Sequence, residues 1–403
     1  MRDEMNIIYV SRLCSSRKFK DIFENAIIKP PQQAQKYHRL LVEGLARNDG
    51  IAVQAISSLP INRSMSKKIL FKREIEEVEG IDYTYLPFVN LPVLKQVIIF
   101  FSCFFRLCKI INKNRNSVII CDVLNISLAG AAVLVSRLSK ITCVGIVTDV
   151  PFYLASMSED TSRSKNRLIS EINTYIMSKF DAYVFLTPYM NQLINKKNKR
   201  YVIIEGQVDA NMVDYKNELS SKYETNVCLY AGELNKKYGI KMLTDAFIAA
   251  QVENSELHIY GSGSFEHELH QICRQHGNIK YFGVVSNDII IKEQTKATLL
   301  INPRPTNEEY TKFSFPSKNM EYMVSGTAML TTNLPGMPLE YRHYIYIFED
   351  ETVQGLAANI RTLLSNPKEE LFNKGLEAKQ FVLKNKNNII QAGKIISMLK
   401  ERK

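Results

Sequence analysis

The stretch Ile301–Thr332, INPRPTNEEYTKFSFPSKNMEYMVSGTAMLTT, holds a clear alternation of structural elements. An apolar segment at Thr298–Asn302 predicts a strand, which runs into a polar loop. A helix is expected over Ser317–Ser325, and a second apolar strand over Ala328–Thr331. A strand, a helix and a further strand in this order predict a βαβ unit with parallel strands.

The same alternation extends along the whole chain. Further strands are expected in the N-terminal half at Met5–Val10, Ile51–Ile56, Val118–Cys121, Cys143–Val147, Ala182–Leu186 and Tyr201–Ile204, and in the C-terminal half at Val227–Ala231, Glu256–Tyr260, Ile279–Phe282 and Ile345–Phe348. Because helical patterns separate these strands, the fold class is α/β with two parallel sheets.

A polar stretch at Tyr215–Asn226 divides the two halves. It predicts one domain over residues 1–212 and a second over residues 213–380. The chain is expected to close with one long helix from Pro367 to Lys400, of which the part from about residue 381 to 403 packs back on the first domain. The length of 403 residues suits two domains.

Composition narrows the class of protein. Apolar residues make up 45% and charged residues 23%, as in soluble globular proteins. The seven cysteines form no C-x-x-C pair, and the N-terminal residues do not resemble a secretory signal, so a reducing cytoplasm is expected. The net charge of +11 favours anionic partners, but no nucleic-acid-binding motif accompanies it, so no nucleic acid partner is expected.

The most apolar segment is Val93–Ile111, VLKQVIIFFSCFFRLCKII. Its uncharged part, Gln96–Phe105, is about half the length that a bilayer span requires. Two interpretations remain open. One is a helix buried in the core. The other is an interfacial helix on an anionic membrane, with bulky apolar side chains in the lipid and flanking cations at its surface.

Cations gather where the helix at Pro316-Ser317 begins. Lys318 lies in its first turn, where a positive charge opposes the helix dipole, and Arg304 and Lys312 lie in the loop before it. An anion bound at this helix N-terminus would explain the arrangement, because free N–H groups and cations then act together. The alternative is a solvated pair of Lys318 with Glu321, worth a few tenths of a kcal/mol.

Four motifs in this half resemble the signature of family-4 retaining glycosyltransferases of the GT-B fold. The first combines Phe315-Pro316-Ser317-Lys318 with Glu321-Tyr322-Met323 and Ser325-Gly326. The others are YAGELNKKYG at Tyr230–Gly239, LHIYGSGSFEHEL at Leu257–Leu269 and YFGVV at Tyr281–Val285. The first motif is similar to a branch associated with bacterial capsule, exopolysaccharide or O-antigen assembly. The resemblance implies two Rossmann-like domains whose parallel sheets face a central cleft.

The resemblance also implies roles for residues. Glu321 would accept hydrogen bonds from the donor's ribose, and Lys237 or Lys236, with a second cation, would neutralise the diphosphate. Gly232, Gly261 and Gly263 would let the backbone approach the nucleotide, and Val284 would border the base. The donor-binding set implied is Gly232, Lys236, Gly261, Gly263, Val284, Arg304, Lys312, Ser314, Phe315 and Ser317, and the catalytic set is Asp149, Lys237, Lys318 and Glu321.

The chain departs from the family pattern at three places. Phe313 stands where the family has a first glutamate, and Glu233 stands where it has an arginine. The spacing from lysine to glycine carries one extra residue, Tyr238. Arg304, Lys312 or Lys318 is therefore expected to supply the charge of the missing arginine.

The N-terminal half offers candidates for the acceptor. Asp149 ends a predicted strand and is expected either to orient a substrate or to act as a cap or turn residue. Glu205 is expected near the donor sugar or in a plain turn. Gln33 and Gln35 lie in the segment where acceptors usually bind in this fold, an inference from fold analogy alone.

The function implied is retaining transfer of a sugar from a UDP-, GDP- or dTDP-linked donor to a glycan acceptor, lipid-linked, in bacterial surface polysaccharide biosynthesis. The resemblance implies that no cofactor or metal is needed, and no Asp-x-Asp motif argues otherwise. Two alternatives remain. A sugar-nucleotide epimerase would need paired acids, for which Asp149, Glu205 and Glu321 are the candidates. An inactive nucleotide-binding scaffold subunit would fit the missing glutamate at Phe313.

Overall fold

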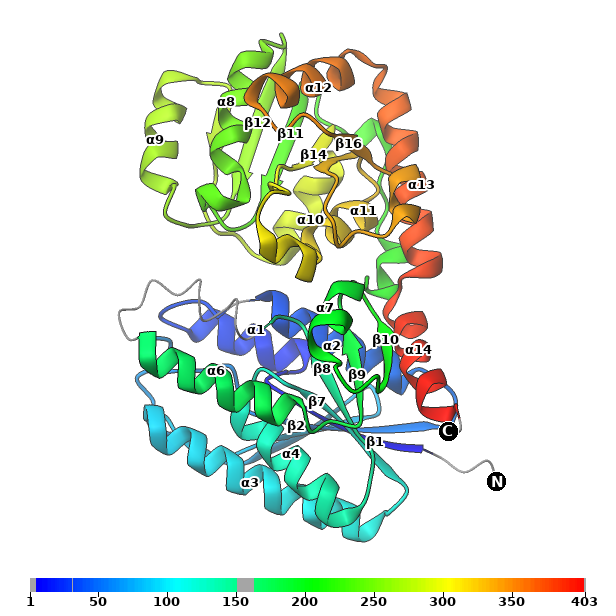
Figure 1. Cartoon of the computed structure of the whole chain (residues 1–403). Coiled ribbons are helices and arrows are strands. Elements are labelled where there is room, and N and C mark those ends of the chain that lie inside the picture. The colour runs from blue at the N-terminus through cyan, green and yellow to red at the C-terminus, as the bar shows by residue number, and fades with distance from the viewer. Residues whose placement is uncertain (1–4, 31, 151–162, 402–403) are drawn as a thin grey trace. The chain divides into compact units, whose positions relative to one another are not determined.

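The computed structural model describes residues 5–30, 32–150 and 163–401. The chain divides into two compact units. Unit 1 consists of Met1–Gln207 together with Asn388–Lys403, and unit 2 consists of Val208–Asn387. Figure 1 shows the elements of each unit.

Unit 1 is built on an 8-stranded sheet in the order β10-β9-β8-β7-β1-β2-β5-β4. Every neighbouring pair is parallel except β4 with β5. Its strands are β1 (Met5–Ser11), β2 (Ile51–Ser57), β4 (Glu74–Val78), β5 (Ile81–Tyr85), β7 (Ser117–Asp122), β8 (Cys143–Val147), β9 (Ala182–Phe185) and β10 (Arg200–Ile203). A separate antiparallel pair joins β3 (Leu70–Phe71) to β6 (Phe88–Val89).

Helices cover both faces of this sheet (Figure 1). They are α1 (Ser16–Asn25), α2 (Gln32–Ala46), α3 (Pro92–Lys113), α4 (Ile126–Ser139), α6 (Arg163–Met177), α7 (Pro188–Ile194) and α14 (Asn388–Lys400). Helix α3 packs along α4, and α14 packs along α2. None of the helices in the described part of the chain combines the length and apolarity that a bilayer crossing requires.

Unit 2 is built on a 6-stranded sheet in the order β13-β12-β11-β14-β15-β16, and all its pairs are parallel. Its strands are β11 (Asn226–Ala231), β12 (Ser255–Tyr260), β13 (Ile279–Tyr281), β14 (Leu299–Asn302), β15 (Met329–Thr332) and β16 (Tyr346–Phe348). Its helices are α8 (Ile240–Ala250), α9 (Glu266–Gln275), α10 (Asn287–Lys296), α11 (Ser317–Ser325), α12 (Val353–Ser365) and α13 (Lys368–Asn385), with 3₁₀ turns η1 (Ala210–Asp214), η2 (Leu219–Ser221), η3 (Lys236–Tyr238), η4 (Glu309–Phe313) and η5 (Leu339–His343).

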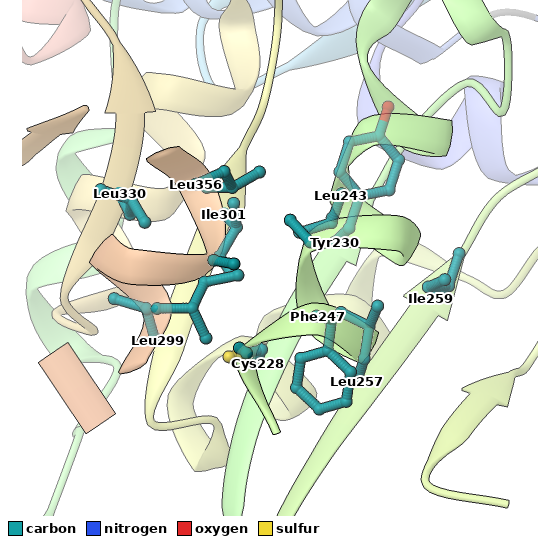
Figure 2. Packing of buried hydrophobic residues seen from close by; sticks show 14 of the residues in the cluster. Cys228, Tyr230, Leu243, Phe247, Leu257, Ile259, Leu299, Ile301, Leu330 and Leu356 are labelled. Carbon is teal, nitrogen blue, oxygen red and sulfur yellow. The ribbon is translucent and has the colours of Figure 1, made fainter. Parts of the chain in front are cut away.

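The inner strands of the unit 2 sheet, β11, β14 and β15, are buried on both faces, as strands of a parallel sheet covered by helices are. Along β11, Cys228 and Tyr230 enter a core shared with α8 and α12, which Figure 2 shows from close by. Val227 and Leu229 point the other way into a core shared with α11 and α13. Side chains that alternate along β11 thus pack into two hydrophobic cores, one on each face of the sheet.

The structure confirms the α/β class and the two parallel sheets, and it corrects three details. Helix α1 is not among the elements expected from the sequence; it forms because Ser15 caps it by accepting the backbone N–H of Lys18 and because Ile22 is buried. The single closing helix is interrupted between α13 and α14 at Lys386 and Asn387. The β4–β5 hairpin was not expected from the sequence, because β4 reads as a run of charged residues.

Candidate functional site

Loops that follow β11 and β12 meet at the carboxyl edge of the unit 2 sheet. A Cβ placed on Gly261, whose φ is +129°, would lie 1.8 Å from the carbonyl oxygen of Gly232. A Cβ on Gly263 would lie 2.4 Å from the carbonyl oxygen of Leu234. Only glycine therefore allows the two loops to pack backbone against backbone, which gives the edge its shape.

Lys318 reaches from the first turn of α11 to the end of β11. Its Nζ donates a hydrogen bond of 2.7 Å to Tyr230 Oη and lies 4.2 Å from the centre of that ring. A Cβ on Gly232 would lie 2.0 Å from Lys318 Nζ. Glycine at position 232 therefore leaves the space that the ammonium group fills.

Burial, together with the positive charge of Arg304, lowers the pKa of Lys318 to about 7. The carboxylates of Glu321 and Glu233 act in the opposite direction. The amine is thus partly neutral near pH 7. A bound anion would favour the charged form, because it would replace lost solvation with a direct ionic contact.

Arg304, which follows β14, lies between two aromatic rings. Its guanidinium carbon is 5.5 Å from the centre of the Tyr238 ring and 4.8 Å from that of Tyr310. One guanidinium nitrogen donates a hydrogen bond of 3.1 Å to Ser314 Oγ. Lys237 lies over the same Tyr238 ring, at 5.0 Å. Tyr238, the extra residue of its loop, therefore makes cation–π contacts with both Lys237 and Arg304.

Helix α11 begins at Ser317, and no side chain caps it within the described residues. Pro316, at the N-cap position, has no side-chain acceptor to offer the free amides of the first turn. Glu321 lies one turn further along, half-buried, and its charge acts on Lys318. Free amides beside Lys318 and the nearby Arg304 form an arrangement suited to a phosphate group.

Other predicted donor residues lie at the margin of this cluster or outside it. Lys236 pairs with Glu268 on α9 at 2.5 Å. Phe315 packs in the core, with its ring 5.4 Å from that of Tyr341, so its side chain is not available to a ligand. Val284 is exposed in the loop after β13, and Lys312 and Ser317 are exposed around α11.

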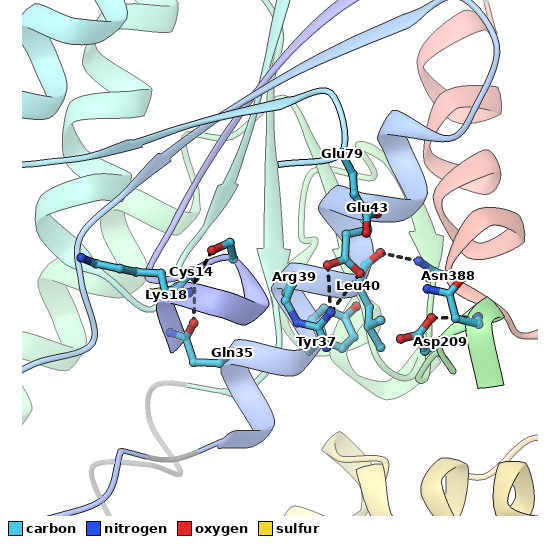
Figure 3. A network of polar contacts seen from close by, with 12 residues as sticks. Cys14, Lys18, Gln35, Tyr37, Arg39, Leu40, Glu43, Glu79, Asp209 and Asn388 are labelled. Atoms are coloured by element: carbon cyan, nitrogen blue, oxygen red, sulfur yellow. Dashed lines mark hydrogen bonds and ion pairs between the residues drawn. The ribbon is translucent and has the colours of Figure 1, made fainter. Parts of the chain in front are cut away.

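The predicted residues of unit 1 come from α2 and from the segments that follow β8 and β10. Gln35 is buried, and its amide oxygen accepts the backbone N–H of Cys14 at 2.9 Å (Figure 3). Its amide nitrogen donates to the carbonyl of Arg12. Its polar atoms are thus used within the fold. Gln33 is exposed on α2, Glu205 is buried after β10, and Asp149 is half-buried after β8.

Sequence reasoning missed the aromatic partners of Lys318 and Arg304. Tyr230 holds Lys318, and Tyr238 and Tyr310 flank Arg304. These contacts join segments far apart in the chain, so spacing along the sequence gives no direct sign of them. The extra residue at Tyr238 was the one visible signal, and it was interpreted as a departure from the family pattern.

A second polar cluster that the sequence did not indicate lies in unit 1. His38 on α2 has its Nδ1 2.7 Å from Tyr9 Oη and its Nε2 3.7 Å from Asp122 Oδ2. Burial lowers the pKa of His38, although the charge of Asp122 raises it. A buried neutral imidazole thus ties α2 to β1 and to the carboxyl end of β7.

Comparison with known proteins gives a fold for the whole chain and a family match for its C-terminal part. Residues 213–399 match the family model described as Glycosyl transferases group 1. No curated protein matches the sequence.

Among the described residues, no group of His, Cys, Asp and Glu side chains is placed to hold a metal ion.

Solved structures resemble the whole chain. Sucrose-phosphate synthase from Thermosynechococcus elongatus has a TM-score of 0.68 at 14% identity, over 98% of this chain and 99% of that one. HepE from Anabaena, solved in complex with UDP, has a TM-score of 0.62 at 14% identity, over 98% and 99% of the two chains. The lipopolysaccharide outer core galactosyltransferase WaaB has a TM-score of 0.61 at 14% identity with the same coverage.

These neighbours share the GT-B fold with the chain from end to end, and the family match covers unit 2 together with α14. The chain therefore has the GT-B fold, and its residues 213–399 match the glycosyl transferases group 1 family model.

Proposed function

We propose that this enzyme moves a sugar from a nucleoside diphosphate donor, UDP-, GDP- or dTDP-linked, to a glycan acceptor with retention of anomeric configuration. The acceptor is lipid-linked and belongs to the assembly of a bacterial surface polysaccharide. The observation that carries the donor part is the position of Lys318 against Gly232 and Tyr230, with the charge of Arg304 acting on it. The structure of HepE, which has a similar fold and was solved in complex with UDP, supports this part of the proposal.

The chemistry proposed follows from the charges. As the bond from the anomeric carbon to the diphosphate breaks, the electron pair leaves with the diphosphate, whose negative charge grows. Lys318, Arg304 and the free amides of α11 would stabilise that charge more in the transition state than in the ground state. The acceptor hydroxyl attacks from the same face, and the departing phosphate takes its proton.

Glu321 would orient the donor by accepting hydrogen bonds from the ribose hydroxyls. Its place on α11, one turn after Lys318, supports this role, because both side chains then act on one ligand. With these cations neutralising the diphosphate, we propose that no bound metal is required. Turnover is expected to persist in EDTA, and loss of activity that Mg²⁺ restores would contradict this.

The test is a panel of sugar nucleotides in two steps. Thermal shift with UDP, GDP and dTDP identifies the base, and incubation with the matching sugar nucleotides then reports release of free sugar or transfer to extracted lipid-linked intermediates. A nucleoside diphosphate is expected to stabilise the protein, and Glu321→Ala to remove that effect with a melting temperature within a few degrees of the wild type. Stabilisation without any hydrolysis or transfer would favour a scaffold.

We propose in addition that unit 1 rests on an anionic membrane surface through α3. The side chains of Val93, Val97, Phe101 and Phe105 are spaced four residues apart and are 77, 46, 53 and 65% exposed. Lys109 and Lys113 continue the same spacing and are exposed as well. The opposite side of α3 is buried through Ile99, Cys103 and Leu107. An apolar stripe that ends in cations supports binding in the headgroup region.

A further inference from the structure

A cavity of about 510 Å³ opens in unit 1 between α1 and the edge strand β4. It is lined by Arg17, Lys18 and Asp21 of α1, by residues 74–76 of β4 and by Tyr85. Because Glu74 pairs with Tyr85 in the antiparallel hairpin, the beginning of β4 lies beside the carboxyl end of β5. The cavity therefore lies at the edge of the sheet where parallel α/β folds bind ligands.

The charges around the cavity are already paired. Arg17 lies 3.1 Å from Glu76, and Lys18 lies 2.5 Å from Glu74. Asp21 is exposed and adds a further carboxylate. A phosphate would have to displace these carboxylates from both cations. Hydroxyl groups, in contrast, can donate to the carboxylates and accept from the cations at the same time.

Glu76 is held in one orientation before any ligand arrives. Its carboxylate accepts hydrogen bonds from Ser15, which caps α1, from Tyr85 and from Arg17. Burial raises the pKa of Glu76, but these hydrogen bonds outweigh that effect and leave the pKa below its ordinary value. The carboxylate is thus ionised and held in one orientation at neutral pH. It is therefore preorganised to accept hydrogen bonds from hydroxyl groups.

Apolar surface accompanies these polar groups. Ile75 is 57% exposed on β4, between the two paired glutamates. Cavities of this size hold small organic ligands. A sugar ring presents hydroxyls around its edge and C–H groups on its faces, and this lining offers partners for both.

We propose that this cavity is the saccharide subsite for the acceptor, and that it takes a neutral, hydroxyl-rich sugar ring rather than a phosphorylated one. The proposal rests on the transferase function above and adds the place and the chemistry of the acceptor. It also differs from the expectation for Gln33 and Gln35, since the amide of Gln35 is used within the fold.

The test is saturation-transfer NMR on the full-length protein. The probes are glucose, galactose and N-acetylglucosamine, set against glucose 6-phosphate and glucuronate. Wild type should bind at least one of the neutral sugars in preference to both charged ones. Glu74→Gln combined with Glu76→Gln should weaken that binding at least about tenfold, because hydrogen bonds to a charged group are lost.

The matched control is Arg47→Gln, which breaks the ion pair of Arg47 with Glu79, 3.2 Å apart and outside the cavity. It should leave sugar binding unchanged. If the double variant fails to fold, Glu74→Gln alone provides the test, since Glu74 is exposed. Preference for glucose 6-phosphate, absence of binding to any neutral sugar, or full binding by the variant would overturn the proposal.

Nucleoside diphosphate binding, followed by thermal shift in the same variants, separates the two proposals. It should be unchanged in all of them, because Glu74 and Glu76 belong to unit 1 and the donor cluster to unit 2. Failure of every nucleoside diphosphate to bind wild type would instead reject the proposed donor site.

Discussion

At the scale of single residues, Lys318 depends on groups that lie far away in the chain. Tyr230 accepts its hydrogen bond across 88 positions, and Gly232 leaves the space for its ammonium. The sequence indicated Lys318 itself, because a cation at the start of a helix needs an explanation. It did not indicate Tyr230, because the contact arises only when β11 and α11 pack together.

The ionisation of Lys318 predicts how donor binding depends on pH. With a pKa of about 7, the free enzyme has lost most of this proton above pH 8, whereas the complex with a diphosphate should hold it. The complex then binds more protons than the free enzyme, so affinity should fall as pH rises, by up to about tenfold per unit. Titration calorimetry between about pH 7.5 and 9.5 measures this, since a terminal phosphate with a pKa of about 6 is already ionised there.

Lys318→Met is the control for that experiment. It should bind the diphosphate weakly, and its affinity should change little over the same range, because the titrating amine is gone. A wild-type affinity that stays constant from pH 7.5 to 9.5 would show that the amine does not take up a proton on binding.

At the scale of elements, the contact between the loops after β11 and β12 depends on Gly261. Gly261→Ala would place a Cβ 1.8 Å from a backbone oxygen at a φ of +129°, so the loops must separate. Strain and overpacking predict a loss of about 2–4 kcal/mol in the free energy of unfolding. Gly277→Ala, with open space around it, should change it by less than about 0.5 kcal/mol. Equal urea midpoints for the two variants would contradict this account of the edge.

The exposed stripe of α3 predicts the outcome of a vesicle experiment. Phe101→Asp combined with Phe105→Asp should release the protein from anionic vesicles in a flotation assay, with little change in melting temperature because both rings are exposed. Val213→Asp alters a residue that is 64% exposed in unit 2, and it should leave binding intact. Aggregation of the double variant, or flotation equal to wild type, would argue that the stripe is not a lipid surface.

Elements with strong apolar periodicity could be predicted from the sequence, and those that depend on charged side chains could not. The inner strands β11, β14 and β15 came from apolar runs, which strands buried on both faces require. The strand β4, by contrast, reads EIEEV. Two of its glutamates, Glu74 and Glu76, are compensated by Lys18 and Arg17 of α1, contacts that exist only in the folded chain. The cavity beside β4 could not be predicted from the sequence either, because it forms only when α1 and β4 pack together.

At the scale of the whole molecule, the chain returns to unit 1 after completing unit 2. Asn388 donates a hydrogen bond of 3.0 Å to the carbonyl of Leu40 (Figure 3), and Gln391 donates one of 2.6 Å to that of Gly206. A Cβ on Gly44 would lie 2.1 Å from the carbonyl oxygen of Asn388, so α2 and α14 pack closely. A closing helix was expected, but its interruption at Lys386 was not, because no proline or glycine lies at that point.

Deletion of residues 388–403 is expected to destabilise unit 1 selectively. It removes α14 from α2 and leaves the buried side chain of Leu40 and its neighbours partly exposed, while residues 208–387 keep all of unit 2. Limited proteolysis followed by mass spectrometry should show early cleavage within residues 5–207 and an unchanged fragment from unit 2. Equal protection of both units after the deletion would show that α14 does not support unit 1.

The central claim is that the carboxyl edge of the unit 2 sheet binds the diphosphate of a donor through Lys318. It is tested most directly by calorimetric titration of wild type and Lys318→Met with the nucleoside diphosphate that the thermal-shift panel selects, and with the same nucleoside without phosphates. Wild type should bind the diphosphate at least about tenfold more tightly than Lys318→Met does, as loss of a charged hydrogen bond implies, and the two proteins should bind the nucleoside alike. Equal affinity of the two proteins for the diphosphate would contradict the account.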